Sequence, residues 1–327
     1  MPAHDNIITN PVGHHAAQMS GLILCLLLFV NLGWADNHPD ILTVTPDLKD
    51  LLLTGGEPTP GKMVLQQLPN YLGSEVAHTL YLPTDWEPGK KFPVIIEYRG
   101  NNSWVRCGGG LGYGLSGGKG FIWAVLPYVS PDHKSDMDWW WGDVAATVAY
   151  AKQAVPAICQ EWGGDPNKVI LTGHSRGAIA CNFIGLHDDN IAKLWRAMIP
   201  ISHYDDGHTG WGMTKAEMAL SRERLQRLGT IPQLICGEYH LPIKHKDKTL
   251  LELIRVQQIT SFAIAKEKLL LHPMIDLEGT RRFITANLSA GNITFLDLPY
   301  VNHSCAYVMC DIPERKRIRE WMEQVLK

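Results

Sequence analysis

The 327-residue sequence has no internal repeat, no low-complexity tract and no apolar run of the roughly 20 residues that crossing a bilayer takes. It also lacks an excess of either charge, since 30 Lys and Arg stand against 33 Asp and Glu and only 19% of the residues are charged. These absences exclude a disordered chain and the basic surface of a nucleic-acid binder, so we expect no nucleic-acid partner. What is present is an ordinary globular composition, 45% hydrophobic, in a chain long enough for one large α/β domain or two smaller ones.

The N-terminal stretch contains one short apolar run. Residues 22–30 (LILCLLLFV) have the length of a signal-peptide core, and Gly33 and Ala35 supply small residues at the −3 and −1 positions of a cleavage site. No Lys or Arg precedes Met19, which is itself a plausible start, so the usual positive charge is missing. We expect a signal peptide at 1–35, a secreted or periplasmic protein and no membrane span after its removal; a buried N-terminal segment is the alternative.

Cysteine is sparse, and no two cysteines have the C-x-x-C spacing of a zinc or redox site. Removing Cys25 with the leader leaves an even number, which permits disulfides in an exported chain. Cys159, Cys181 and Cys236 fall in apolar helix or strand patterns and are interpreted as buried thiols. The six cysteines beyond the leader are Cys107, Cys159, Cys181, Cys236, Cys305 and Cys310.

Apolar runs of strand length alternate with stretches of helical spacing, a pattern typical of a mostly parallel sheet covered by helices on both faces. Two segments are longer than plain connections, and we interpret them as lid-like insertions at the carboxyl edge of the sheet. We therefore expect one domain over 36–327 with insertions at about 203–228 and 239–280. Strands are expected at 77–82, 92–98, 121–126, 168–172, 197–201, 233–236 and 293–298, and helices at 143–162 and 178–186.

The five-residue run Gly173-His174-Ser175-Arg176-Gly177 has the form G-x-S-x-G, which alone is a weak signal. Its context strengthens it, because a short apolar strand precedes it and a run of small and apolar residues follows as a helix. A serine on such a sharp turn needs glycines on both sides, where Cβ atoms would collide. We therefore predict that Ser175 is a nucleophile; a tight turn capping a helix is the structural alternative.

A serine hydroxyl needs a base, and a nucleophile on such a turn is followed along the chain by its acid and then by its histidine. His303 directly follows the last expected strand and is the predicted base. Glu238 directly follows the expected strand at 233–236 and is the predicted acid, which would hold one imidazole tautomer. Asp205 or Asp206, after the strand at 197–201, and Asp247 remain alternatives for the acid.

Two backbone N–H groups are predicted to stabilise the oxyanion that forms on attack. One belongs to Arg176, which follows the predicted nucleophile, and the other to Asn101, in the turn after the strand at 92–98; an ordinary turn without this role is the alternative. The Arg176 side chain is expected to form a structural ion pair, with an anionic substrate group or the oxyanion itself as the alternative partner.

Three consecutive tryptophans, Trp139, Trp140 and Trp141, are the clearest remaining feature. Aromatic faces stack on sugars and aryl groups, so these side chains are predicted to bind substrate; packing of the loop against the core is the alternative. Two other motifs receive no functional role. The G-x-G-x-x-G match at 112–117 follows no strand, and the cluster of His203, Asp205, Asp206 and His208 has no recognised metal-ligand spacing.

The run at 165–178 (DPNKVILTGHSRGA) resembles the nucleophile region of secreted esterases of the α/β-hydrolase superfamily, including feruloyl-esterase-like, acetylxylan-esterase-like and polyhydroxybutyrate-depolymerase-like proteins. The resemblance implies an α/β-hydrolase fold, an ester substrate, and the roles of nucleophile, base and acid for Ser175, His303 and Glu238. Two departures are a Glu where Asp is more common and the long segment at 239–280.

These observations predict a serine esterase that works by acyl transfer and needs no cofactor or metal. The Trp cluster and the expected export favour a carbohydrate-linked or phenolic ester, either small or attached to a polysaccharide. A serine peptidase and a hydrolase of polyesters or short-chain esters are alternatives on the same fold. A non-catalytic binding protein with a hydrolase-like shell is the alternative of another class.

Overall fold

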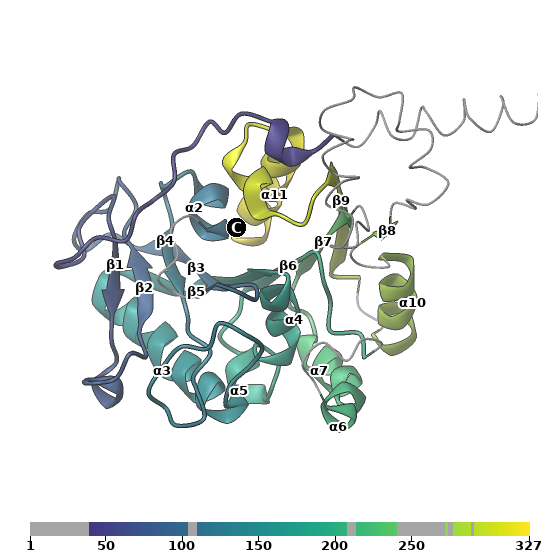
Figure 1. Ribbon diagram of the computed structural model, residues 1–327, viewed down its shortest axis with the longest axis horizontal. Coiled ribbons are helices and arrows are strands. Elements are labelled where there is room, and N and C mark those ends of the chain that lie inside the picture. Colours follow the sequence, from purple (N-terminus) through teal and green to yellow (C-terminus); the bar gives the residue numbers. More distant parts are fainter. Residues whose placement is uncertain (1–38, 104–109, 208–213, 241–271, 274–276, 289–290) are drawn as a thin grey trace, which may run out of the picture. The chain divides into compact units, whose positions relative to one another are not determined.

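A computed structural model of the chain describes residues 39–103, 110–207, 214–240, 272–273, 277–288 and 291–327 (Figure 1). All of these except Pro39 belong to one compact unit, Asp40–His240 with Leu271–Lys327. The expected signal peptide and most of the expected insertion at 239–280 lie outside the described residues. Within the described ranges, no helix has the length and apolar character that a membrane crossing requires.

The described strands form one nine-stranded sheet in the order β1-β2-β4-β3-β5-β6-β7, with β8 and β9 both paired to β7. The six strands β3, β4, β5, β6, β7 and β9 run parallel to one another, whereas β1, β2 and β8 pair antiparallel with their neighbours. Their bounds are β1 Met63–Gln66, β2 His78–Tyr81, β3 Phe92–Tyr98, β4 Ile122–Val125, β5 Gly164–His174, β6 Ala197–Ile201, β7 Gln233–His240, β8 His272–Pro273 and β9 Ile293–Val301.

Helices cover both faces of this sheet, and each face has its own cluster of buried side chains (Figure 1). One cluster packs α3, α4, α5 and α7 against the sheet, and the other packs α2, η3 and α11 against the opposite face. The helices are α2 Leu111–Ser116, α3 Val144–Trp162, α4 Arg176–Phe183, α5 Asp189–Ala192, α6 Lys215–Ala219, α7 Ser221–Leu228, α10 Leu277–Asn287 and α11 Pro313–Val325, with 3-10 turns η1 Ile41–Thr43, η2 Pro69–Tyr71 and η3 Cys305–Met309.

This strand order, with a helix on each parallel crossover, is the α/β-hydrolase fold, so the prediction of the fold is confirmed. The central strands are built from continuous apolar runs because both of their faces are buried. Six of the seven residues of β3 and all five of β6 are buried, and both strands have the bounds that the sequence predicts.

The order also creates a switch point beside β3, because β4 lies on one side of it and β5 on the other. The connections that leave β3 and β5 therefore diverge at their carboxyl ends and open a crevice there, where parallel α/β sheets bind their ligands. Residues 99–103 follow β3 and Ser175 follows β5, so the predicted nucleophile lies at this crevice.

The five described cysteines are free thiols. Cys159, Cys181 and Cys236 are buried, which confirms their interpretation from the apolar pattern, and burial raises the pKa of the Cys159 thiol to about 11. Cys25 and Cys107 lie outside the described residues.

Candidate active site

Ser175 lies in a strained turn between β5 and α4. Its φ of 59° and ψ of −122° place an L-residue in the left-handed half of the backbone map, which only a strongly constrained turn maintains. Glycines are required on both sides: a Cβ on Gly177 would overlap the main-chain oxygen of Tyr98, and one on Gly173 would overlap the main chain of Gly177. The Ser175 hydroxyl makes no capping hydrogen bond to α4, so it is available to other partners.

His303 reaches this hydroxyl from the connection after β9. The strand ends at Val301, and Asn302 turns the chain with a φ of 119° while its Nδ2 donates to Asp40 Oδ1 at 2.8 Å. Ser304 then caps η3 by accepting a hydrogen bond from a main-chain N–H. Held between these two anchors, His303 places its Nε2 3.0 Å from Ser175 Oγ.

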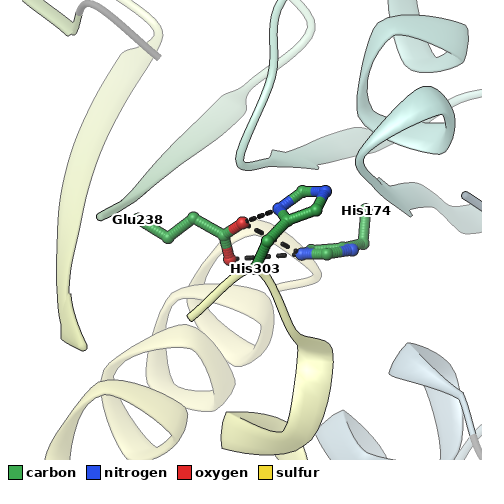
Figure 2. Close-up of side chains that lie close together, drawn as sticks. All are labelled: His174, Glu238 and His303. Atoms are coloured by element: carbon green, nitrogen blue, oxygen red, sulfur yellow. Dashed lines mark hydrogen bonds and ion pairs between the residues drawn. The ribbon is translucent and has the colours of Figure 1, made fainter. Parts of the chain in front are cut away.

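Glu238 completes the arrangement from β7, where its carboxylate hydrogen-bonds to the Nδ1 of His303 (Figure 2). The strand continues past Glu238 to His240, with a register shift against β9 at this point, so the residue lies within the strand and not after it as the sequence suggested. Glu238 is 2% exposed. Burial alone would raise its pKa, but His174 and His303 outweigh burial and lower the pKa to about 2.

The alternative acids do not take this place. Asp205 forms a buried bidentate pair with Arg224, at 2.5 Å to Nε and 2.9 Å to Nη2. Both ring nitrogens of His303 are already engaged, by Ser175 and Glu238, which leaves none for Asp205 or Asp206. Asp247 lies outside the described residues.

His174, the second residue of the G-x-S-x-G motif, hydrogen-bonds to the same carboxylate. Its Nε2 lies 3.1 Å from Glu238 Oε2 and 3.3 Å from Oε1, and its ring stacks on His303 with centroids 4.6 Å apart (Figure 2). His174 is part of the G-x-S-x-G motif, but the motif allows any residue at that position. The sequence therefore could not predict its contact with Glu238.

His203 is a third imidazole at the site, and no role was predicted for it from the sequence. Its ring meets His303 edge to face at 5.4 Å, and its Nδ1 hydrogen-bonds to Ser202 Oγ at 2.7 Å. Ser202 Oγ also accepts from the main-chain N–H of Ser175 at 3.2 Å, which ties the nucleophile turn to the end of β6. Burial, with the nearby His303 and His174, lowers the pKa of His203 to about 3, so it stays neutral near neutral pH.

The two predicted oxyanion donors lie close to Ser175, since Arg176 follows it directly and Asn101 follows Gly100. A Cβ on Gly100 would lie 3.3 Å from Ser175 Cβ, so the turn after β3 passes directly beside Ser175. Within the part of the chain that the structure describes, neither the N–H of Arg176 nor that of Asn101 meets an acceptor. The Asn101 side chain has a separate contact, since its Oδ1 accepts from Trp140 N at 2.9 Å.

The Arg176 side chain does not form the ion pair that the sequence suggested. It is 1% exposed, lies over the ring of Tyr128 at 4.0 Å and donates to main-chain carbonyls instead. These carbonyls belong to two loops, the turn after β3 and the Trp loop at 137–141. The acceptors are Arg99 O, Gly100 O, Ser103 O, Met137 O and Trp140 O, at 3.3, 3.0, 3.4, 3.2 and 2.6 Å.

A cavity of about 580 Å³ opens above the Ser175 hydroxyl, and two of the three consecutive tryptophans line it. Trp139 is 49% exposed, and Trp140 is partly buried. Trp141 does not line the cavity: it is 4% exposed and packs against Phe183 with ring centroids 4.7 Å apart. The prediction that Trp141 binds substrate is therefore corrected, because its backbone turns its ring into the core.

Among the described residues, one group has the composition of a metal site: His174, Glu238 and His303, with ligand atoms within 4.8 Å of one another. Two imidazoles and a carboxylate are zinc-binding types. Here each imidazole has a ring nitrogen at hydrogen-bonding distance from the carboxylate, so an N–H group on each ring accounts for the two contacts. In the cluster of His203, Asp205 and Asp206, the side chains have different partners, since His203 hydrogen-bonds to Ser202 and Asp205 to Arg224. His208 lies outside the described residues.

No protein-family model matches the sequence, and no curated protein matches it either. Solved structures do match it, at low sequence identity in the three cases that follow. A thermostable esterase aligns at 13% identity over 81% of this chain and 60% of its own, with a TM-score of 0.42. The AtxE2 isopeptidase aligns at 15% identity over 81% and 40%, with a TM-score of 0.49, and a ferulic acid esterase at 13% over 81% and 97%, with a TM-score of 0.48.

The chain thus spans less than two thirds of the first two of these proteins. The fold itself is established by the strand order and not by these similarities.

Proposed function

We propose that this protein is a serine hydrolase that cleaves carboxylic esters through an acyl-enzyme intermediate. One observation carries the proposal: His303 lies 3.0 Å from the Ser175 hydroxyl through Nε2 and hydrogen-bonds to the buried Glu238 through Nδ1. Acyl transfer by serine requires a nucleophile, a base and a carboxylate that orients the base, with the base in contact with both of the others.

The chemical steps follow from these contacts. Ser175 Oγ attacks the ester carbonyl while its proton passes to His303 Nε2, and the same proton then goes to the leaving alcohol. Glu238, with a pKa of about 2, stays ionised and stabilises the imidazolium through Nδ1–H. A water molecule deprotonated by His303 then attacks the acyl-enzyme, which releases the acid and restores Ser175.

The oxyanion of each tetrahedral intermediate would lie between the N–H groups of Arg176 and Asn101. The Arg176 N–H is at the amino end of α4, where the helix dipole adds to the attraction of negative charge. Each such donor is worth about 3 kcal/mol of transition-state stabilisation. Ser202 supports the geometry by holding the N–H of Ser175.

As substrate we propose an ester linked to a carbohydrate or a phenolic group. The support is the aromatic wall of the cavity, where Trp139 and Trp140 offer flat faces beside Ser175. Since ordinary sugars and aryl acids are uncharged or singly charged, an aromatic wall suits them better than a strongly charged one. Peptide amides and aliphatic polyesters are the competing substrates.

We further propose that the protein is exported. The support is the apolar run at 22–30 followed by Gly33 and Ala35. N-terminal sequencing of the protein recovered from the medium or periplasm tests this, and an intact Met1 or Met19 there would contradict cleavage after Ala35.

A fluorophosphonate probe tests the catalytic proposal directly, because it labels only an activated serine. The wild type should be labelled and Ser175→Ala should not; absent labelling of the wild type would favour the non-catalytic binding protein. With labelling established, rates on p-nitrophenyl esters, feruloyl esters, acetylated xylan and a peptide amide would rank the substrates. Faster cleavage of the peptide than of any ester would overturn the esterase assignment.

A further inference from the structure

The carboxylate of Glu238 accepts hydrogen bonds from two imidazoles, whereas the proposed mechanism needs only one. His303 donates through Nδ1, and His174 donates through Nε2 at 3.1 Å. An ionised carboxylate can only accept, so the Nε2 of His174 carries a proton in this arrangement. The two rings are stacked, with planes 30° apart, so both face the same carboxylate from adjacent positions (Figure 2).

Burial makes this second donor important. Glu238 is 2% exposed, so water contributes little to holding its carboxylate, and fixed donors must do so. His174 also immediately precedes Ser175 and pairs with Ile201 in the β5–β6 ladder, so its main chain is fixed at the end of a central strand. A rigid strand thus positions the donor that holds the acid.

We propose that His174 is a positioning residue for the hydrolysis: it orients Glu238 and shares its negative charge with His303. This inference rests on the proposed function of the site. Because the carboxylate is shared, removing the His174 hydrogen bond changes the interaction between Glu238 and His303, and the pH dependence of the reaction reports that change. The further titratable and charged groups around His174 in the cavity are His203 after β6, Arg176 on α4, and Glu97 and Arg99 from the end of β3.

Two substitutions separate the hydrogen bond from the ring. His174→Phe keeps a flat ring against His303 but has no donor, whereas His174→Gln keeps an N–H donor that does not titrate. For His174→Phe we expect kcat to fall about 10- to 100-fold, the effect of losing a charged hydrogen bond, with KM within about twofold. We also expect the acid limb of its kcat/KM profile to move to higher pH, because the carboxylate then interacts with one imidazole instead of two. His174→Gln should restore kcat to within about fivefold of the wild type and return the acid limb toward its wild-type position.

His187 provides a matched control, because its Nδ1 also meets a carboxylate, Asp188 Oδ2 at 3.4 Å, but at an exposed site away from the cavity. His187→Phe should leave both kcat and the pH profile unchanged. Far-UV circular dichroism checks folding, and His174→Met replaces the Phe variant if that variant does not fold.

A His174→Phe enzyme with wild-type kcat and a superimposable pH profile would overturn the inference. So would a Gln variant as impaired as the Phe variant, because packing of the ring would then be the whole role. Fluorophosphonate labelling of the wild type separates the two proposals. If the wild type is not labelled, the proposed function itself is wrong. If it is labelled but the His174 variants behave like the wild type, only the role of His174 is wrong.

Discussion

Replacing Arg176 by Met should damage both stability and the proposed catalysis, because one buried guanidinium joins two loops to the helix that follows the proposed nucleophile. Its donors meet five main-chain carbonyls, of which Trp140 O at 2.6 Å and Gly100 O at 3.0 Å are nearest. Counting only these two at about 1.5 kcal/mol each, and the contact with the Tyr128 ring at about 1 kcal/mol, the loss is about 4 kcal/mol. Met fills much of the same volume, so the variant tests the hydrogen bonds more than the packing.

The catalytic consequence should appear in kcat more than in KM. The turn at 99–103 carries the Asn101 N–H, and without the guanidinium that N–H is free to move away from the oxyanion. Losing one such donor lowers kcat about 100- to 1000-fold. Arg176→Lys keeps the charge but has a compact ammonium with three donors, so it should fall between Met and the wild type in both properties.

Urea unfolding followed by tryptophan fluorescence gives the stability of each variant, and p-nitrophenyl acetate hydrolysis gives kcat and KM. Arg196→Met is the control, because Arg196 is exposed and its substitution should change the unfolding free energy by less than about 0.5 kcal/mol. The reasoning is refuted if Arg176→Met unfolds within about 1 kcal/mol of the wild type and keeps kcat within threefold.

Further outcomes are expected elsewhere in the molecule. His78 is buried and its pKa is lowered to about 4 by desolvation, so the unfolded state binds more protons between pH 4 and 6.5. Stability should therefore fall as the pH is lowered through this window, by about 2 kcal/mol at pH 5 relative to pH 8, and His78→Phe should weaken this dependence in chemical unfolding. Asp205→Asn leaves the Arg224 charge unpaired and should destabilise by about 3–5 kcal/mol in urea while preserving kcat of the folded protein, whereas Glu238→Ala should lose kcat by orders of magnitude. Gly177→Ala puts a Cβ onto a carbonyl of β3, so it should lower the melting temperature sharply or prevent folding; a melting temperature like the wild type's would contradict the tight-turn geometry.

The sequence predicted the central strands well because burial on both faces leaves a continuous apolar signature. Phe92–Tyr98 and Ala197–Ile201 have the expected bounds, and α3 begins one residue later than expected, after Asp143 caps it. The helix α2 was not predicted, since Leu-Gly-Tyr-Gly-Leu-Ser has low helix propensity. Packing overrides that propensity: a Cβ at Gly112 would overlap the Trp123 ring, so the glycine allows the helix to lie close to β4.

The residues proposed for the chemistry were named from the sequence, because Ser175 and His303 each follow a strand and Glu238 lies near the end of another. The tryptophans show the limit of that reasoning. Three identical neighbours in sequence have three different environments, since Trp140 adopts a φ of 53° and the chain then buries Trp141 against Phe183. Orientation around a loop depends on backbone angles that composition does not encode.

The double contact of Glu238 depends on distances that no linear pattern contains. Its strand β7 is separated from β5 by β6, and two strand spacings amount to about 9.5 Å. A side chain on β7 must reach most of the way across β6 to meet His174, and Glu extends further than Asp by one carbon–carbon bond, about 1.5 Å. The structure therefore gives a physical reason for a Glu at this position, where Asp is more common. The longer side chain lets one carboxylate contact both His303 and His174, at the end of β5. The departure and the His in the G-x-S-x-G motif are two parts of one arrangement.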